Sequence, residues 1–262
     1  MGVLICCGFI LSLMCAAPVF AQASAEKAWK ILEGGIADKS QDQRVKALRA
    51  LGLLWEDKRA EQFAEKALSD EKPEVRAAAA RALGEMGARS SAPQLKEALK
   101  DKKAAVVVAA ADALFRLQDE IAFSVYYAVL MGEKKTGESL MESQLKMLKD
   151  PKALASVGIA FVPYAGAGMA VLKMATRDDT SPLRAAAALK LSKDPDPRSG
   201  QALAQSAQDP KWVVRAAVMD AIAKRGDATL LDAVVPLLDD KDDTVRFNAA
   251  ATVVRLTTIK GQ

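Results

Sequence analysis

A repeated pair of residues, an aspartate followed six positions later by an arginine, constrains the fold of this chain more than any other feature. Within each half of the chain, successive pairs lie 31 or 32 residues apart. A period of this length accommodates two helices of about 12 residues and the two turns that join them. The chain is therefore predicted to be an array of helix pairs. The pairs are Asp38 with Arg44, Asp70 with Arg76, Asp178 with Arg184, Asp209 with Arg215 and Asp240 with Arg246, and the same offset picks out Asp101 before Val107 and Asp150 before Ser156.

The composition agrees with an all-helical fold. Of the 262 residues, 51% are apolar and only 5% are aromatic, and alanine is abundant. Alanine has the highest helix propensity, whereas strands would need more β-branched and aromatic runs. The net charge is +4, with 37 basic and 33 acidic residues interspersed, which is typical of an ordinary solvated surface.

We expect each repeated aspartate in the turn between the two helices of a pair. There its carboxylate can accept hydrogen bonds from free amides at the start of the next helix. It can also face the arginine of the same or of a neighbouring repeat. Stacked repeats would then form an Asp–Arg ladder along the array, and Pro73 and Pro210 fit the first turn of second helices.

The repeat unit is an apolar helix, an aspartate, a short turn, Val-Arg, an Ala-rich helix and Leu-Gly, as in PEVRAAAARALGEMG at residues 73–87. Further copies are LKEALKD before VVVAAADAL and LLDAVVPLLDD before TVRFNAAATVV. The unit resembles the HEAT repeat, especially the short bacterial kind called PBS-lyase HEAT-like, over most of residues 26–258. The resemblance implies a right-handed α-solenoid, a superhelix of about seven HEAT-like helix pairs. Its second helices would line the concave face, and each repeat would bury its apolar face only against its neighbours.

The spacing divides the chain into four parts. We predict a signal peptide at 1–23, HEAT-like repeats one to three at 24–118, and a divergent apolar middle at 119–180. HEAT-like repeats and a C-terminal cap follow at 181–262. The middle is assigned an inserted apolar helix and degenerate repeats, because Asp101 and Asp150 are 49 residues apart, about 18 more than one period. The cap is expected because Asn248, Thr252 and Thr257 interrupt the apolar positions of the last helix.

The amino-terminal segment indicates export. Residues 2–21 carry no charged side chain, and small residues follow. This pattern predicts a secretory signal peptide cleaved after Ala21 or Ala23, and thus a periplasmic or secreted protein. The alternative is an uncleaved N-terminal membrane anchor, because the apolar run is nearly long enough to span a bilayer.

Two apolar segments break the repeat pattern in the middle of the chain. Residues 121–131 are apolar all round, and residues 153–172 carry no charge but contain Pro163 and three glycines. They can pack on each other and on the flanking repeats, or form an exposed apolar surface. A membrane span is a third interpretation, which proline and glycine disfavour. The aromatic anchors of an exposed surface, facing a partner protein or a membrane, would be Tyr126, Tyr127, Phe161 and Tyr164.

The residues that most enzymes use are missing. The chain has no histidine, and its three cysteines, Cys6, Cys7 and Cys15, lie in the predicted signal peptide. The usual general base, thiolate nucleophile and zinc ligands are therefore lacking. The acidic clusters at 178–179 and 239–243 belong to ladder turns. We predict no catalytic activity, no cofactor and no metal site.

Nucleic-acid binding is also disfavoured. A basic groove should show at the second-helix position five residues after the ladder residue, but the charge there changes sign and then vanishes. The residues are Arg49, Arg81, Asp112, Leu189, Asp220 and Ala251.

The sequence thus predicts a monomeric, non-catalytic protein–protein interaction scaffold of the cell envelope. It would bind an unknown protein through the concave face or the apolar middle. One alternative is a protein associated with the membrane surface, held by an uncleaved N-terminal anchor or by residues 153–172. Another is an enzyme with an unrecognised carboxylate site.

Overall fold

The computed structural model describes residues 16–122 and 180–260, and all regular elements within these ranges are helices. The first range contains α1 (Ala16–Ile36), α2 (Gln41–Leu51), α3 (Lys58–Ala67), α4 (Pro73–Met86), the 3-10 helix η1 (Arg89–Ser91), α5 (Ala92–Ala98) and α6 (Ala104–Arg116). The second contains α11 (Ser181–Leu191), α12 (Pro197–Ser206), α13 (Trp212–Arg225), η2 (Ala228–Leu230), α14 (Leu231–Val234), η3 (Val235–Asp239) and α15 (Asp243–Lys260). The predicted all-α solenoid is confirmed for this part of the chain.

Local sequence explains where the second helices begin, end and pack. Pro73 occupies the first turn of α4, where its missing N–H leaves no hydrogen bond unmade. Gly87 ends α4 with a φ of 73°, a left-handed conformation that glycine adopts without strain. Between them, the alanines of α4 are buried, and a Cβ on Gly84 would lie only 2.7 Å from Cα of Ala113 in α6. Small residues therefore allow α4 and α6 to pack at close range.

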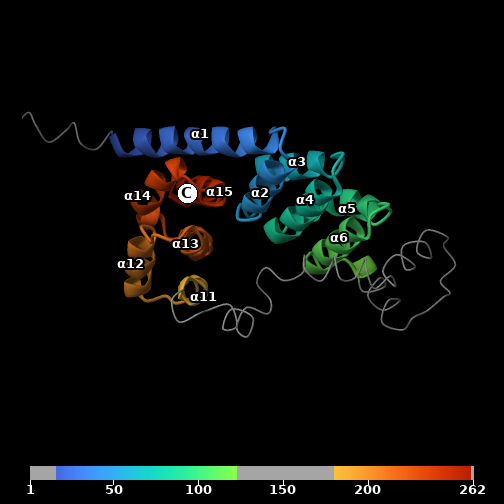
Figure 1. Ribbon diagram of the computed structural model, residues 1–262. Coiled ribbons are helices and arrows are strands. Elements are labelled where there is room, and N and C mark those ends of the chain that lie inside the picture. The colour runs from blue at the N-terminus through green and yellow to red at the C-terminus, as the bar shows by residue number, and fades with distance from the viewer. Residues whose placement is uncertain (1–15, 123–179, 261–262) are drawn as a thin grey trace, which may run out of the picture.

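The second helices form one continuous row whose order in space differs from their order in the sequence. The row runs α11, α13, α15, α2, α4, α6, because α15 contacts α13 on one side and α2 on the other. Figure 1 shows this row as an arch, with α12, α14, α1, α3 and α5 on its outer side. The carboxy-terminal repeats thus precede the amino-terminal repeats in the array.

The position of α15 corrects the expectation of a polar C-terminal cap. This helix lies inside the row, and two of the three polar residues that were interpreted as a cap form hydrogen bonds with α13, whereas Thr257 bonds to carbonyls of α15 itself. Asn248 Nδ2 donates to the carbonyl of Ala216 at 3.3 Å, and Thr252 Oγ1 donates to that of Met219 at 3.0 Å. Buried residues from Val245 to Leu256 occur on several sides of α15, so other helices must cover it on more than one side.

Helix α1 bridges the junction between the two halves, since it packs on both α15 and α2. Ala28 and Leu32 of α1 are fully buried there. A Cβ on Gly35 would overlap the ring of Phe247 in α15, so the glycine permits the close approach. At the rim of the junction, Lys27 Nζ lies 2.6 Å from Asp239 Oδ2.

Three predictions on the chain's organisation lie mainly or wholly outside the described residues. They are the signal peptide over its first 15 residues, the inserted helix, and the degenerate repeats of the middle. Helix α1 begins at Ala16 and continues through Ala21 and Ala23, the two predicted cleavage positions.

Candidate functional site

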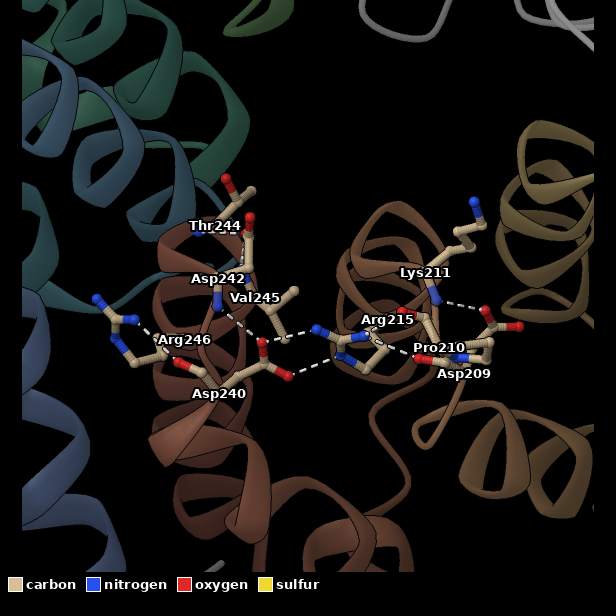
Figure 2. A network of polar contacts seen from close by, with 9 residues as sticks. All are labelled: Asp209, Pro210, Lys211, Arg215, Asp240, Asp242, Thr244, Val245 and Arg246. Atoms are coloured by element: carbon tan, nitrogen blue, oxygen red, sulfur yellow. Dashed lines mark hydrogen bonds and ion pairs between the residues drawn. The ribbon is translucent and has the colours of Figure 1, made fainter. Parts of the chain in front are cut away.

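The ladder arginine of α13 connects two successive repeats (Figure 2). Arg215 Nε and Nη2 donate to the two carboxylate oxygens of Asp240 at 2.7 and 2.8 Å. Its Nη1 donates to the main-chain carbonyl of Asp209 at 2.8 Å. One guanidinium thus bonds the turn of its own repeat through a carbonyl and the turn of the next repeat through a carboxylate.

The same carboxylate contact recurs at three other positions. Arg76 Nε lies 2.7 Å from Asp101 Oδ2, Arg44 Nε lies 2.9 Å from Asp70 Oδ2, and Arg184 Nε lies 2.9 Å from Asp209 Oδ2. The ladder aspartates of the described residues also accept a hydrogen bond from the amide two residues further on, which fixes the turn before each second helix. These amides belong to Ser40, Lys72, Lys103, Lys211 and Asp242.

Burial makes the contact between Arg215 and Asp240 the most enclosed of these ion pairs. Their side chains are only 8% and 7% exposed. Burial alone would raise the pKa of Asp240, but hydrogen bonds from Arg215 and from the amide of Asp242 hold this pKa below its usual value. The hydrogen bond to Asp240 in turn raises the pKa of Arg215. Both groups therefore stay charged, and their role is to fix the spacing of the repeats.

The ladder is interrupted where α15 meets α2. Arg246 donates to the carbonyl of Asp240 at 2.9 Å and to the carboxylate of Asp243 in its own helix. Asp243 also accepts a hydrogen bond from Gln43 of α2. The carboxylate of Asp38 accepts from the amide of Ser40 two residues on. Asp150 and Asp178, the remaining predicted ladder residues, lie outside the described residues.

Charged side chains gather on the inner side of the arch, on helices α2, α4, α6 and α13. We call them the inner-face cluster. They come from two levels, five and nine residues after the ladder position, that is, from adjacent turns of each helix. The cluster consists of Arg49, Arg81, Asp112 and Asp220 at the first level, and of Glu85, Arg116 and Lys224 at the second.

Sequence reasoning examined the first level and missed the second. The signal was available, because Glu85, Arg116 and Lys224 all lie nine residues after a ladder position, and so does Arg255 of α15. Residues four apart share one helix face, so charges at both levels indicate a charged patch rather than isolated surface residues.

Some members of the cluster pair within their own helix. Arg116 Nε lies 2.9 Å from Asp112 Oδ2, and Lys224 Nζ lies 2.9 Å from Asp220 Oδ1. Charged groups on α4 and α6 also interact electrostatically with charged groups on α13, on the opposite side of the arch. The side chain of Glu85 in α4 keeps contact with solvent, but its loss of hydration among the surrounding helices raises its pKa. The charge of Asp220 on α13 raises this pKa further, and Arg116 and Lys224 oppose the shift.

Arg49 and Arg81, like Glu85, differ from the paired members of the cluster. Within residues 16–122 and 180–260, none of these three side chains makes a hydrogen bond or an ion pair. Burial lowers the pKa of Arg81, and the charge of Arg49 lowers it further, whereas the charges of Asp112 and Glu85 oppose the shift. Two neighbouring cations therefore lack a direct ion pair in the described part of the chain, and two carboxylates act on Arg81 from a longer distance.

An aromatic side chain lies close to this face. Trp55, in the loop after α2, is 39% exposed, and the guanidinium of Arg255 lies 3.9 Å above its ring. Arg255 Nε also donates to the carbonyl of Ala223 at 2.8 Å, so it joins α13, α15 and the loop after α2. The predicted aromatic anchors Tyr126, Tyr127, Phe161 and Tyr164 lie outside the described residues.

A second polar cluster holds α3 against η1. Glu61 is buried and accepts hydrogen bonds from Ser90 and Ser91, and Lys58 Nζ lies 2.9 Å from Ser90 Oγ. A serine beside a lysine can form a nucleophile and its base, but here Lys58 is also paired with Glu61 at 2.8 Å. We assign these contacts a structural role.

Within the described residues, no group of three or more acidic, histidine or cysteine side chains is arranged to hold a metal ion. Among the helices of the same two ranges, none combines the length and apolar character required to cross a membrane.

The model of a protein family, HEAT repeats, matches residues 30–114 and 168–256. None of the curated proteins matches the chain by sequence.

Several solved structures are similar at low identity. The complex of CpcE and CpcF of phycocyanin lyase from Nostoc sp. PCC7120 is 18% identical, with 91% of this chain and 94% of that chain covered and a TM-score of 0.34. Human deoxyhypusine hydroxylase in complex with glycerol is 14% identical, with 92% and 97% covered and a TM-score of 0.32. A designed armadillo repeat protein is 15% identical, with 88% and 99% covered and a TM-score of 0.28. At these TM-scores the likenesses carry no argument about activity.

Proposed function

Because the chain belongs to the HEAT repeat family, we propose that it is a non-catalytic scaffold whose protein partner docks inside the arch. HEAT repeat solenoids typically mediate protein–protein interactions. Their concave surfaces offer extended binding faces, because the stacked second helices present side chains at regular intervals.

The observation that carries this proposal is the contrast between the ladder and the inner face. Ladder arginines such as Arg215 are bonded to carboxylates of the chain itself. Arg49 and Arg81 have no such bond within the described ranges, although they project from the same helices that carry ladder arginines. Arginines without a direct ion pair in a concave surface favour a binding role.

The proposal includes no catalytic step. The chain lacks histidine, and its three cysteines precede residue 16. The paired carboxylates that the sequence suggested as an alternative lie in ladder turns, where Asp240 is bonded to Arg215 and Asp243 to Arg246. Carboxylates held in this way are occupied by structural ion pairs.

We further propose that the protein is exported to the periplasm or secreted. The uncharged run at residues 2–21 and the small residues after it support this localisation. The alternative, association with the membrane surface, would rely on that run as an uncleaved anchor or on residues 153–172.

Affinity capture tests the scaffold role. The purified chain is immobilised and exposed to an extract of the cell envelope, and each retained protein is identified by mass spectrometry and purified. The proposal expects at least one retained protein to bind the free chain with a defined stoichiometry in calorimetry. If no retained protein binds in calorimetry, the scaffold role is wrong.

A further inference from the structure

We propose that Arg49 and Arg81 form a docking site for a short acidic segment of a protein, one that carries two neighbouring carboxylate side chains. This inference rests on the proposed scaffold function, because it states the chemistry of the partner.

The two arginines stand at equivalent positions on adjacent helices. Each lies five residues after the ladder arginine of its helix, Arg44 in α2 and Arg76 in α4, and these helices are in contact. Packed helices have axes about 8–10 Å apart, so the two guanidinium groups can be separated by a similar distance. Alternate side chains of an extended peptide are about 7 Å apart and lie on one face. An extended segment can therefore present one carboxylate to each arginine.

The energetic state of the two arginines favours such a ligand. Arg81 has lost part of its hydration and lies close enough to Arg49 for the two charges to disfavour each other, and the nearby charges of Asp112 and Glu85 compensate this only in part, because the pKa of Arg81 stays lowered. A carboxylate would neutralise the repulsion and could form the bidentate hydrogen bonds that a guanidinium makes best. The chain uses this same arrangement in the ladder, where Arg76 binds Asp101 through Nε and Nη2 at 2.7 and 2.9 Å.

The flanking residues limit the length of the ligand. At the level of Arg49 and Arg81, the next helix on one side presents Asp112 and the next on the other side presents the uncharged Ala251. Glu85 lies one turn beyond Arg81, and Asp220 on the opposite limb carries a second negative charge close to it. Asp112 and Glu85 also act on Arg81, so the positive charge of the site is small and each acidic residue beyond two would add repulsion from these carboxylates. This pattern favours a short acidic peptide over a nucleic acid.

The test uses a fluorescein-labelled octapeptide with glutamate at alternate positions, and a matched peptide with glutamine in their place. Binding to the purified chain is measured by fluorescence anisotropy at low salt. We expect the acidic peptide to bind, the glutamine peptide to bind at least tenfold more weakly, and added salt to weaken the complex. The double variant Arg49→Gln/Arg81→Gln should lose at least tenfold in affinity. The control Arg89→Gln removes an exposed charge from η1, outside the second helices, and should bind as the parent does.

A charge-reversal variant that gains binding to a basic peptide distinguishes loss of the site from loss of folding. The variant Arg49→Glu/Arg81→Glu should bind an octapeptide with lysine at alternate positions, which an unfolded chain would not do selectively over the glutamine peptide. The inference is overturned if the parent does not bind the acidic peptide, or if the glutamine double variant binds it unchanged. Tighter binding of a single-stranded oligonucleotide of equal charge would also overturn it. A captured partner whose affinity is unchanged in the double variant would refute this site and leave the scaffold role intact.

Discussion

The guanidinium of Arg215 is held by the carboxylate of Asp240, which lies 25 residues further along the chain, with both side chains less than a tenth exposed. The same arginine reaches back to the carbonyl of Asp209, six residues before it. Each such ion pair between a ladder arginine and the ladder aspartate of the next repeat fixes the distance between two consecutive second helices. The inner face of the arch, and with it the placement of Arg49 and Arg81, depends on this spacing.

Removal of one partner of the buried ion pair between Arg215 and Asp240 should be strongly destabilising. We expect Asp240→Ala to lower the free energy of unfolding by about 3 kcal/mol, because Arg215 would remain as a buried charge without its carboxylate. Denaturant unfolding followed by circular dichroism measures the difference.

The adjacent residue provides a matched control. Asp239 is 72% exposed and pairs with Lys27 at the surface, so Asp239→Ala should cost less than about 1 kcal/mol. An equal loss of unfolding free energy in Asp240→Ala and Asp239→Ala would show that burial of the ion pair has no special role. Asp209→Ala should give an intermediate loss, because its partner Arg184 is 42% exposed.

Glu85 should make stability depend on pH in the opposite sense from the ladder aspartates. Loss of hydration raises the pKa of Glu85, although the side chain keeps contact with solvent, so the folded chain holds this proton at pH values where the unfolded chain has released it. Stability should therefore decrease as pH rises from the usual carboxyl range through the raised pKa of the folded state. The variant Glu85→Gln should remove this decrease and be at least as stable as the parent at pH 7.

Denaturant midpoints between pH 4 and pH 8 measure the effect of Glu85. Glu74 is also exposed but lies at the opposite end of α4, so it provides the control Glu74→Gln, which should keep the pH dependence of the parent. A Glu85→Gln profile parallel to that of the parent would contradict the assignment.

Two neighbouring glycines of α1 should respond oppositely to alanine. At Gly34 an added Cβ meets no atom within 4 Å, so Gly34→Ala should stabilise the helix by up to about 1 kcal/mol. At Gly35 an added Cβ would overlap the ring of Phe247 and lie 2.8 Å from the Cβ of Ala47. Gly35→Ala should therefore destabilise the protein by about 1–3 kcal/mol. Thermal melting of both variants tests the contact between α1 and α15, and a stabilising Gly35→Ala would refute it.

Export predicts a defined amino terminus. Protein isolated from the cell envelope should begin at Gln22 or Ser24, as intact-mass spectrometry can determine. Cleavage at either position would leave Ala28, Leu32 and Gly35 in place, so the processed chain should keep the junction between α1 and α15. A mature protein that retains residues 1–21 would support the membrane-anchored alternative instead.

The repeat period made the helix pairs predictable, because it reflects a local unit of two helices and an aspartate turn. The choice of partner within the ladder was not determined in the same way. An offset of six residues places Asp209 close to Arg215 along the chain, yet the closer aspartate contributes its carbonyl and the more distant Asp240 its carboxylate. Sequence spacing alone does not separate these two roles.

The order of the repeats in space could not be predicted from the period. The period defines the repeat unit, but it does not specify which two repeats pack against each other. Asn248 and Thr252 were interpreted as solvent-facing cap residues, whereas their partners are main-chain carbonyls of α13. In the sequence, Arg49 and Arg81 were considered only as the start of a possible basic stripe, which ends at Asp112. Their lack of a direct ion pair within the described ranges depends on packing, which the sequence does not encode locally.

The central claim is that the carboxy-terminal repeats stack on the amino-terminal repeats of the same chain to form one arch. A zero-length carbodiimide cross-linker joins an amine to a carboxylate only when they are in contact. Lys27 and Asp239, 2.6 Å apart across the junction, should be joined in the full chain. Lys96 and Asp119, 2.9 Å apart within the amino-terminal half, provide the positive control.

Mass spectrometry of a mixture of unlabelled and ¹⁵N-labelled chains identifies the linked peptides and shows whether they come from one molecule. The account predicts that Lys27 is joined to Asp239, with both peptides carrying the same label. Absence of this link while Lys96 is joined to Asp119, or a link between peptides of different label, would contradict the arch.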